Sequence, residues 1–92
     1  MYLVVSYDVV SNRRRARLAK RLKNDLERVQ KSVFEGEAEE AAYGRVLKAA
    51  REEIDPAEDS VRVYILCKNC MRNLEVVGTG RSWVTMDGDE VL

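Results

Sequence analysis

The chain has 92 residues, which is enough for one domain, and its 16 Lys+Arg balance 16 Asp+Glu to a formal net charge of zero. Hydrophobic residues make up 46% of the sequence, too many for a disordered chain. No apolar run reaches membrane-spanning length, and residues 1–8 lack the positive lead-in of a signal peptide, so we expect a cytoplasmic protein. Histidine is absent, so any hydrolysis must depend on carboxylates and a hard cation such as magnesium.

The first third of the chain predicts a strand, a helix and a further stretch of strand. Residues 2–8 are rich in aromatic and β-branched side chains, which favour a strand. Ser11 or Asn12 is a suitable N-cap for a helix whose apolar residues recur at helical spacing. Residues 28–36 predict a second strand, bent or folded into a short hairpin. The apolar positions of the helix are Leu18, Ala19, Leu22 and Leu26.

The remainder of the chain predicts a second helix and a clear strand. Residues 37–54 have apolar side chains on one face, and the helix ends at Asp55 because the residue before Pro56 avoids helical geometry. Residues 61–67 form a strand rich in β-branched side chains. The sequence also predicts a polar turn at 68–73. Two short strands are predicted at 74–77 and 82–86, and the flexible residues 78–80 separate these two strands.

This order of elements predicts an α+β fold of the ferredoxin-like βαββαβ type, with both helices on one face of an antiparallel sheet and one or two short extra strands at the C-terminus. We expect residues 1–78 to form the ferredoxin-like core and residues 79–92 to form a tail strand that packs on a partner subunit. The sheet face without helices would otherwise be an exposed apolar patch. A homodimer is therefore expected.

Asp8 is the first candidate functional residue, because it ends the first strand. Side chains alternate along a strand, so Leu3, Val5 and Tyr7 form the better core face and Asp8 points to the helix-free face. A two-fold interface on that face brings two Asp8 carboxylates together, and they repel unless a cation or proton lies between them. The alternative is that Asp8 only caps a turn or the following helix.

A basic segment follows Asp8, at residues 13–23. The first turn of a helix prefers acidic residues, yet arginines crowd this one, which indicates that the charge is used. Arg15 should overhang the end of the sheet near Asp8. The segment suits phosphate binding with little regard for base sequence; the alternative is a solvated basic face paired with the Glu-rich second helix of a neighbour. The candidate nucleic-acid-binding residues are Arg13, Arg14, Arg15, Arg17, Lys20 and Arg21.

Cys67 and Cys70 form a Cys-x-x-Cys pair. A structural zinc site needs four ligands, so a site built from these two thiols would have to be shared across a dimer. A thioredoxin-type redox motif belongs at a helix start in a different fold. We therefore interpret the pair as two reduced, structural cysteines in a turn.

Several of these segments together resemble the CRISPR-associated protein 2 family, over residues 2 to about 78. Tyr7-Asp8-Val9 resembles its signature at the end of the first strand, and the arginine-rich helix follows at the expected distance. The segment RVQKSVFE, residues 28–35, is the most distinctive match. Residues 55–64 resemble its aspartate-led last core strand, and the cysteine turn with the residues that follow resembles one bacterial branch.

The resemblance implies a ferredoxin-like homodimer whose C-terminal strands extend the sheet of the partner subunit. It implies assembly with dimers of the CRISPR integrase, as a heterohexamer or heterotetramer that binds protospacer duplex DNA. It also implies, for some members, a magnesium-dependent endonuclease that cleaves single-stranded RNA or double-stranded DNA, with Asp8 as the Mg²⁺ ligand. Carried over by position, the residues that support catalysis beside Asp8 are Tyr7, Arg15, Arg17, Arg28 and Phe34.

Three functions remain open at this point. The first is a metal-dependent phosphodiesterase, for which one carboxylate per chain is a small ligand set. The second, which we favour as the main cellular role, is a non-catalytic DNA-binding adaptor whose partner performs the chemistry. The third is a toxin-type endoribonuclease of related fold, which explains residues 28–35 less well.

Overall fold

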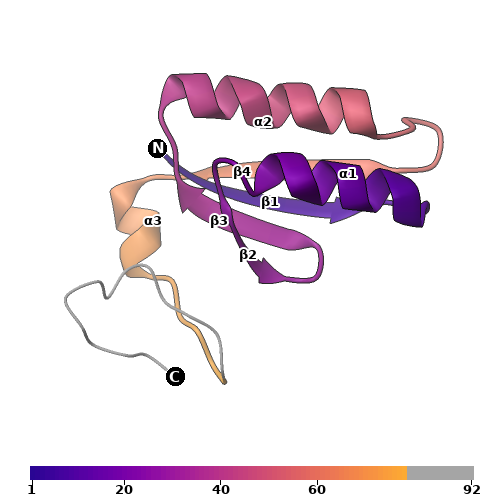
Figure 1. Cartoon of the computed structure of the whole chain (residues 1–92). Helices are drawn as coiled ribbons and strands as arrows, with labels where there is room; N and C mark the ends of the chain where they lie inside the picture. The colour runs from indigo at the N-terminus through magenta and orange to yellow at the C-terminus, as the bar shows by residue number, and fades with distance from the viewer. Residues whose placement is uncertain (79–92) are drawn as a thin grey trace.

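The computed structural model describes residues 1–78, and it has the predicted α+β, ferredoxin-like order of elements (Figure 1). The four strands form one antiparallel sheet in the order β2-β3-β1-β4. The bounds are β1 Tyr2–Asp8, α1 Asn12–Leu22, β2 Glu27–Gln30, β3 Val33–Glu37, α2 Glu40–Glu53, β4 Ser60–Leu66 and α3 Lys68–Arg72.

Strand β1 lies between β3 and β4, and its side chains alternate between the two faces of the sheet. Leu3 and Val5 are fully buried and Tyr7 nearly so, whereas Asp8 is exposed. The prediction for the two faces of this strand is therefore confirmed. Because β1 is central, its C-terminal end places Asp8 next to the loop that leads into α1.

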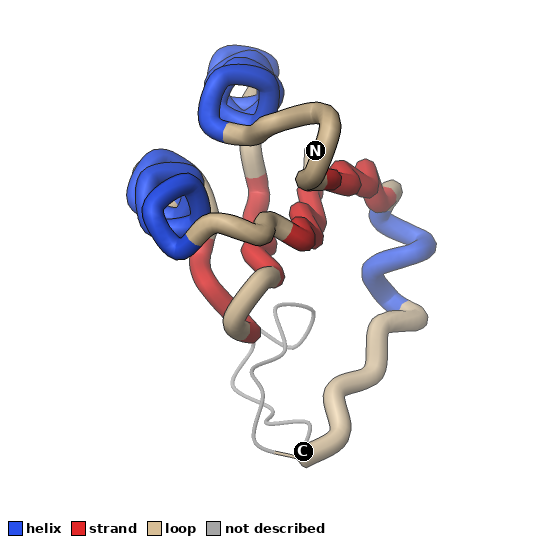
Figure 2. Tube along the Cα trace, turned by 90° about the vertical axis from the view of Figure 1, so that its right-hand side faces the viewer, coloured by secondary structure: helices blue, strands red, loops and turns tan. Residues whose placement is uncertain are grey.

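Helices α1 and α2 pack on the same face of the sheet, and α3 lies apart from both of them (Figure 2). The apolar positions predicted from helical spacing face the sheet. Phe34 of β3 is fully buried beneath the helices. The buried helical residues are Leu18, Ala19 and Leu22 of α1 and Ala42, Val46, Ala49 and Ala50 of α2.

The helix boundaries follow from local chemistry. Ser11 is the N-cap of α1, and its Oγ accepts a hydrogen bond of 3.2 Å from the backbone amide of Arg14. Helix α2 ends at Glu53, three residues before Pro56, with Ile54 extended. The second helix begins later than predicted, at Glu40, because Glu37 pairs with Tyr2 and so belongs to β3. The stretch 28–36 forms a hairpin of two strands.

Two predictions for the C-terminal part of the core were wrong. Residues predicted as a polar turn form the short helix α3, which begins immediately after Cys67. Residues 74–77 form no strand within the described chain, since a strand needs a neighbour to accept its hydrogen bonds and the chain's own sheet provides none there. The strand predicted at 82–86 and the tail at 79–92 lie outside the described residues. Within residues 1–78, the helices are too short and too polar to cross a bilayer.

Candidate nucleic-acid interface

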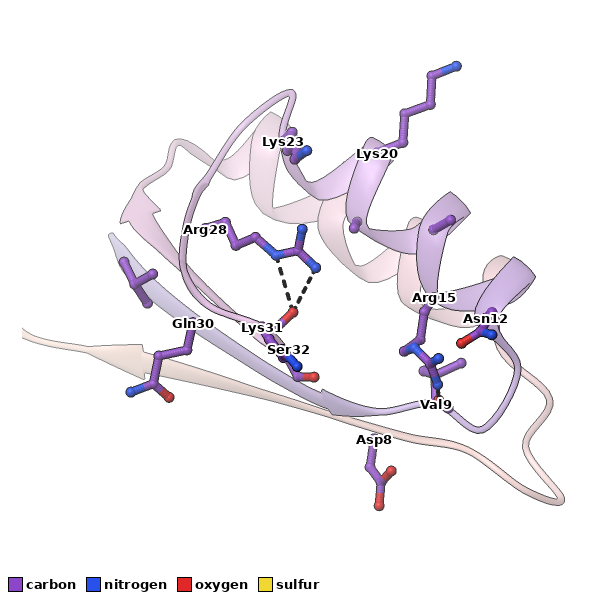
Figure 3. Close-up of a pocket in the computed structure, with 13 residues that line it drawn as sticks. Asp8, Val9, Asn12, Arg15, Lys20, Lys23, Arg28, Gln30, Lys31 and Ser32 are labelled. Atoms are coloured by element: carbon purple, nitrogen blue, oxygen red, sulfur yellow. Dashed lines mark hydrogen bonds between the residues drawn. The ribbon is translucent and has the colours of Figure 1, made fainter. Parts of the chain in front are cut away.

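An open groove of about 1060 Å³ lies between α1 and the β2–β3 turn, at the end of β1 (Figure 3). Asp8 is the one carboxylate among its lining residues, and the other charged side chains there are all positive. The groove therefore carries a strong local excess of positive charge in a protein whose total charge is zero. Its cationic residues are Arg15, Lys20, Lys23, Arg28 and Lys31.

Arg15 secures the loop that follows Asp8. Its Nη1 donates to the carbonyl oxygens of Val9 at 2.6 Å and Val10 at 3.1 Å. The predicted position of Arg15, above the end of the sheet near Asp8, is confirmed. The side chain thus places a positive charge at the groove while it fixes the backbone between β1 and α1.

The β2–β3 turn is held by three of the predicted catalytic residues, Tyr7, Arg28 and Phe34. The carbonyl oxygen of Lys31 accepts hydrogen bonds from Arg28, at 2.8 Å from Nη2 and 3.2 Å from Nε, and from the Tyr7 hydroxyl at 3.2 Å. The Arg28 guanidinium lies 5.6 Å from the centroid of the Phe34 ring, which stacks on Tyr7. Phe34 is fully buried, so it positions Arg28 rather than contacting a substrate.

Three of the predicted nucleic-acid-binding arginines form ion pairs within the chain. Arg14 Nε lies 2.7 Å from Asp59 Oδ2, and Arg17 Nε lies 3.1 Å from Glu53 Oε1. Arg21 Nη1 contacts both Glu52, at 2.9 Å, and Glu53, at 3.0 Å. These arginines therefore pair with acids of their own chain, and Arg17 and Arg21 do so with the Glu-rich end of α2.

Arg13 and Lys20 differ from those three arginines. Both are exposed on α1, and neither forms an ion pair with any carboxylate in residues 1–78. With Arg15, which contacts only carbonyl oxygens, they are the predicted nucleic-acid-binding residues whose charge is not neutralised by a neighbour. The basic segment thus has arginines that pair with α2 or with the residues just before β4, and unpaired cations, of which Arg15 and Lys20 line the groove.

Asp59 joins the segments around the groove, a role that the sequence analysis missed. Its buried carboxylate accepts from the backbone amides of Val10 at 2.9 Å and Asp55 at 2.8 Å and pairs with Arg14. The Arg14 guanidinium, helped by these amides, holds the pKa of Asp59 well below its usual range. The position of Asp59 directly before β4, together with the arginines that begin α1, could have indicated an ion pair from the sequence. The sequence alone does not show which of those arginines pairs with Asp59.

Asp8 lies on the other side of β1 from the cations. It is opposite Ser60 in the β1–β4 register, and its carboxylate points away from α1 and from Arg15 and Arg28 (Figure 3). Within the described chain the Asp8 carboxylate accepts no hydrogen bond and forms no ion pair, and no cluster of three or more potential metal-binding side chains occurs there. Magnesium usually keeps several waters and binds one or two carboxylates, so Asp8 fits the role of a single Mg²⁺ ligand.

Proteins that are similar to this chain in sequence and proteins that are similar to it in structure indicate the same family. The family model described as CRISPR associated protein Cas2 matches residues 1–74. The chain is 36% identical over 81 residues to a CRISPR-associated endoribonuclease Cas2 of Chloroflexus aurantiacus, covering 87% of each chain. It is 43% identical over 82 residues to one of Thermococcus kodakarensis, covering 89% of this chain and 93% of that protein.

Two solved structures have the same fold. The crystal structure of Streptococcus pyogenes Cas2 matches with a TM-score of 0.74 and 34% identity, covering 85% of this chain and all of the other. A hypothetical protein of Thermus thermophilus matches with a TM-score of 0.75 and 35% identity, covering 86% of this chain and 92% of the other. The ferredoxin-like fold, the order of its motifs and these matches agree, and the chain belongs to the CRISPR-associated Cas2 family.

Proposed function

We propose that this protein is a DNA-binding homodimer that acts in CRISPR spacer acquisition together with dimers of the CRISPR integrase. The observation that carries the proposal is the groove at the end of β1, where five cationic residues gather and the single carboxylate, that of Asp8, points away from Arg15 and Arg28. Arg15 and Arg28 contact backbone carbonyls there rather than acids, so no carboxylate of the described chain offsets the positive charge of their guanidinium groups. Such a surface attracts a polyanion.

The groove suits the phosphate backbone better than the bases. Lysine and arginine side chains that contact phosphates fix the position of a duplex without reading its sequence. An acquisition protein has to accept DNA of any sequence, so this mode of binding fits the proposed role. Lys20, Lys23 and Lys31 are exposed at the groove and supply the flexible charges, and the carbonyl-bound Arg15 and Arg28 supply the fixed ones.

The dimer is proposed to form through the helix-free face of the sheet. In the β1–β4 register, Val4 lies opposite Tyr64 and Asp8 lies opposite Ser60 on that face, and Tyr64 is 46% exposed. A second copy would cover these side chains and place the two Asp8 carboxylates near one another, since a two-fold interface pairs each patch with its copy. The tail at 79–92 is proposed to extend this interface.

A second candidate function is a magnesium-dependent endonuclease, because Asp8 is exposed and relatives carry the names endoribonuclease and endonuclease. Asp8 of each subunit would hold the ion, and Arg15 would bring positive charge to the same end of β1. A bound magnesium ion supplies Lewis-acid stabilisation of the developing negative charge on a phosphodiester. Lacking histidine, the chain would have to use a carboxylate or water to take up the proton.

The salt dependence of DNA binding tests the adaptor function. Each phosphate contact contributes about 0.9 to the slope of log K against log salt. The double variant Lys20→Ala/Lys23→Ala removes two charges from the groove and should flatten the slope by more than one. The matched control Arg17→Ala/Arg21→Ala removes two charges that Glu52 and Glu53 already neutralise, and should leave the slope nearly unchanged. Equal slopes for both variants would exclude the groove as the binding surface.

A further inference from the structure

Cys67 and Cys70 lie together where β4 ends and α3 begins. Helix α3 lies apart from α1 and contributes no residue to the lining of the groove (Figure 1). Both thiols are free and exposed, and their Sγ atoms are 3.5 Å apart. None of the residues of α3 is buried. Two nucleophilic side chains are thus held within reach of one another and of solvent, in a position that neither the fold nor the proposed function requires.

The backbone at this point can accept a disulfide. Cys67 is the extended N-cap residue of α3 and Cys70 lies in its first turn, so that the two Sγ atoms lie on the same turn, 3.5 Å apart. The Sγ atoms must move from 3.5 Å to a bond length of about 2 Å, which requires small side-chain rotations and a slight tightening of the turn. Because α3 is exposed, little packing opposes that adjustment.

The two thiols differ in acidity, which assigns them different roles. The backbone amide of Cys70, the Cys70 thiol and the amide of Asn69 lower the pKa of Cys67. The hydrogen bond between the Cys70 thiol and the Cys67 sulfur, followed by the negative charge of Cys67, raises the pKa of Cys70. The thiolate is the reactive form of cysteine, so Cys67 is the attacking group and Cys70 the group that reacts second.

We propose that Cys67 and Cys70 form a redox-active dithiol that exchanges with small-molecule disulfides. The Cys67 thiolate attacks one sulfur of a disulfide R–S–S–R, which forms a mixed disulfide on Cys67 and releases one thiolate R–S⁻. Cys70 then loses its proton and attacks Cys67 Sγ, which closes the Cys67–Cys70 bond and releases the second R–S⁻. The protein loses two electrons and two protons, and the small disulfide becomes two thiols.

A metal site is the main alternative for this pair, and the described residues do not complete one. Zinc requires four ligands in a structural site, and no group of three or more potential ligands occurs in residues 1–78. A zinc ion would therefore have to take both thiols from each of two subunits. That arrangement would also make the thiols unreactive until the metal is removed, which distinguishes it from a free dithiol.

The test is exchange of the full-length reduced protein with oxidised glutathione, followed by acid quenching and intact-mass measurement. The wild type should lose two hydrogens and retain no glutathione. Cys70→Ser should stop at a mixed disulfide with one glutathione on Cys67. Cys67→Ser should react about threefold more slowly at neutral pH than Cys70→Ser, because the amides of Cys70 and Asn69, which lower the pKa of the Cys67 thiol, do not act on the Cys70 thiol. The two single variants should react equally fast in denaturant. Equal rates there would show that the difference between their rates in the native protein comes from the fold.

Three outcomes would overturn the proposal. In the first, the wild type accumulates glutathione on both cysteines, so that no internal disulfide closes. In the second, oxidation gives a covalent dimer on a non-reducing gel, so that the bond forms between chains. In the third, exchange begins only after a chelator removes stoichiometric zinc. The measurement involves no nucleic acid, so its result is independent of the proposed DNA binding.

Discussion

A substitution of Asp8 distinguishes the two candidate functions, the DNA-binding adaptor and the magnesium-dependent endonuclease. Asp8→Asn keeps the size of the side chain but removes the charge that magnesium binds. We expect the variant to lose any metal-dependent cleavage, because no other carboxylate lines the groove. It should still support integration by the partner enzyme, and its dimer should be equally or more stable, because two facing carboxylates repel.

Nuclease and integration assays on wild type and Asp8→Asn, with and without magnesium, check this prediction. Ser60→Ala is the matched control, because Ser60 lies opposite Asp8 in the register but carries no charge. Cleavage that persists at the wild-type rate in Asp8→Asn would exclude the Asp8 nuclease. Integration that collapses while folding, dimerisation and DNA affinity are unchanged would exclude the adaptor.

Asp59 is the residue on which the geometry around the groove depends. Asp59→Asn leaves one acceptor oxygen for Arg14 and for the amides of Val10 and Asp55. We expect Tm at pH 7 to fall by roughly 5 to 10 °C, because buried donors lose their partner. Thermal unfolding followed by circular dichroism measures the loss. Glu58→Gln, which changes only an exposed contact of Arg14, should have little effect.

The pH dependence of that loss has a definite sign. The pKa of Asp59 is lowered in the folded protein, so its contribution is fully present above the unfolded pKa of about 3.9 and disappears as pH falls toward the folded pKa. The Tm values of wild type and Asp59→Asn should therefore converge as the pH is lowered below about 4. A difference that stays constant down to pH 3 would show that the charge of Asp59 is not what stabilises the loop.

At the scale of the elements, the β2–β3 hairpin depends on Phe34. This ring is fully buried, stacks on Tyr7 and supports the Arg28 guanidinium. Phe34→Ala should lower the free energy of unfolding by about 3 to 5 kcal/mol, a typical loss for a buried aromatic residue. Arg28→Met, which keeps an aliphatic cover over the ring, should lower it by no more than about 1 kcal/mol. Urea unfolding measures both changes, and equal losses would contradict the assigned roles.

The hairpin and the second helix also show where sequence patterns are ambiguous. The segment 28–36 was equally consistent with one bent strand and with two short ones, since both have similar composition. Pairing with β1 resolves this, because Tyr2 pairs with Glu37 in the register and so extends β3 by one residue that the pattern placed in the helix. A helix that begins at Glu40 is thus a consequence of the sheet register rather than of helical propensity.

At the scale of the whole molecule, we expect a stable dimer. Light scattering should give about twice the chain mass of 10.5 kDa at micromolar concentration. Tyr64→Arg places a charge on the helix-free face and should shift the protein to a monomer, because two copies of the charge would meet across a two-fold interface. Arg51→Glu on the exposed surface of α2 serves as the control. A folded monomer for the wild type, or a dimer for Tyr64→Arg, would contradict this interface.

The sequence by itself determined the order of elements from β1 to β4, the two faces of β1, a cap for α1 at Ser11 or Asn12 and the family, because these depend on residues close together in the chain or on ordered motifs. The tertiary structure decided which arginines remain available for phosphate. Arg14 and Asp59 are 45 positions apart, and Arg17 and Glu53 are 36 apart. Ion pairs between such distant residues form only when the helices and strands pack, so the local charge pattern was the same for paired and unpaired arginines. The same packing decided that cations of α1 and of the β2–β3 hairpin gather at one groove, and that α3 brings the two cysteines together.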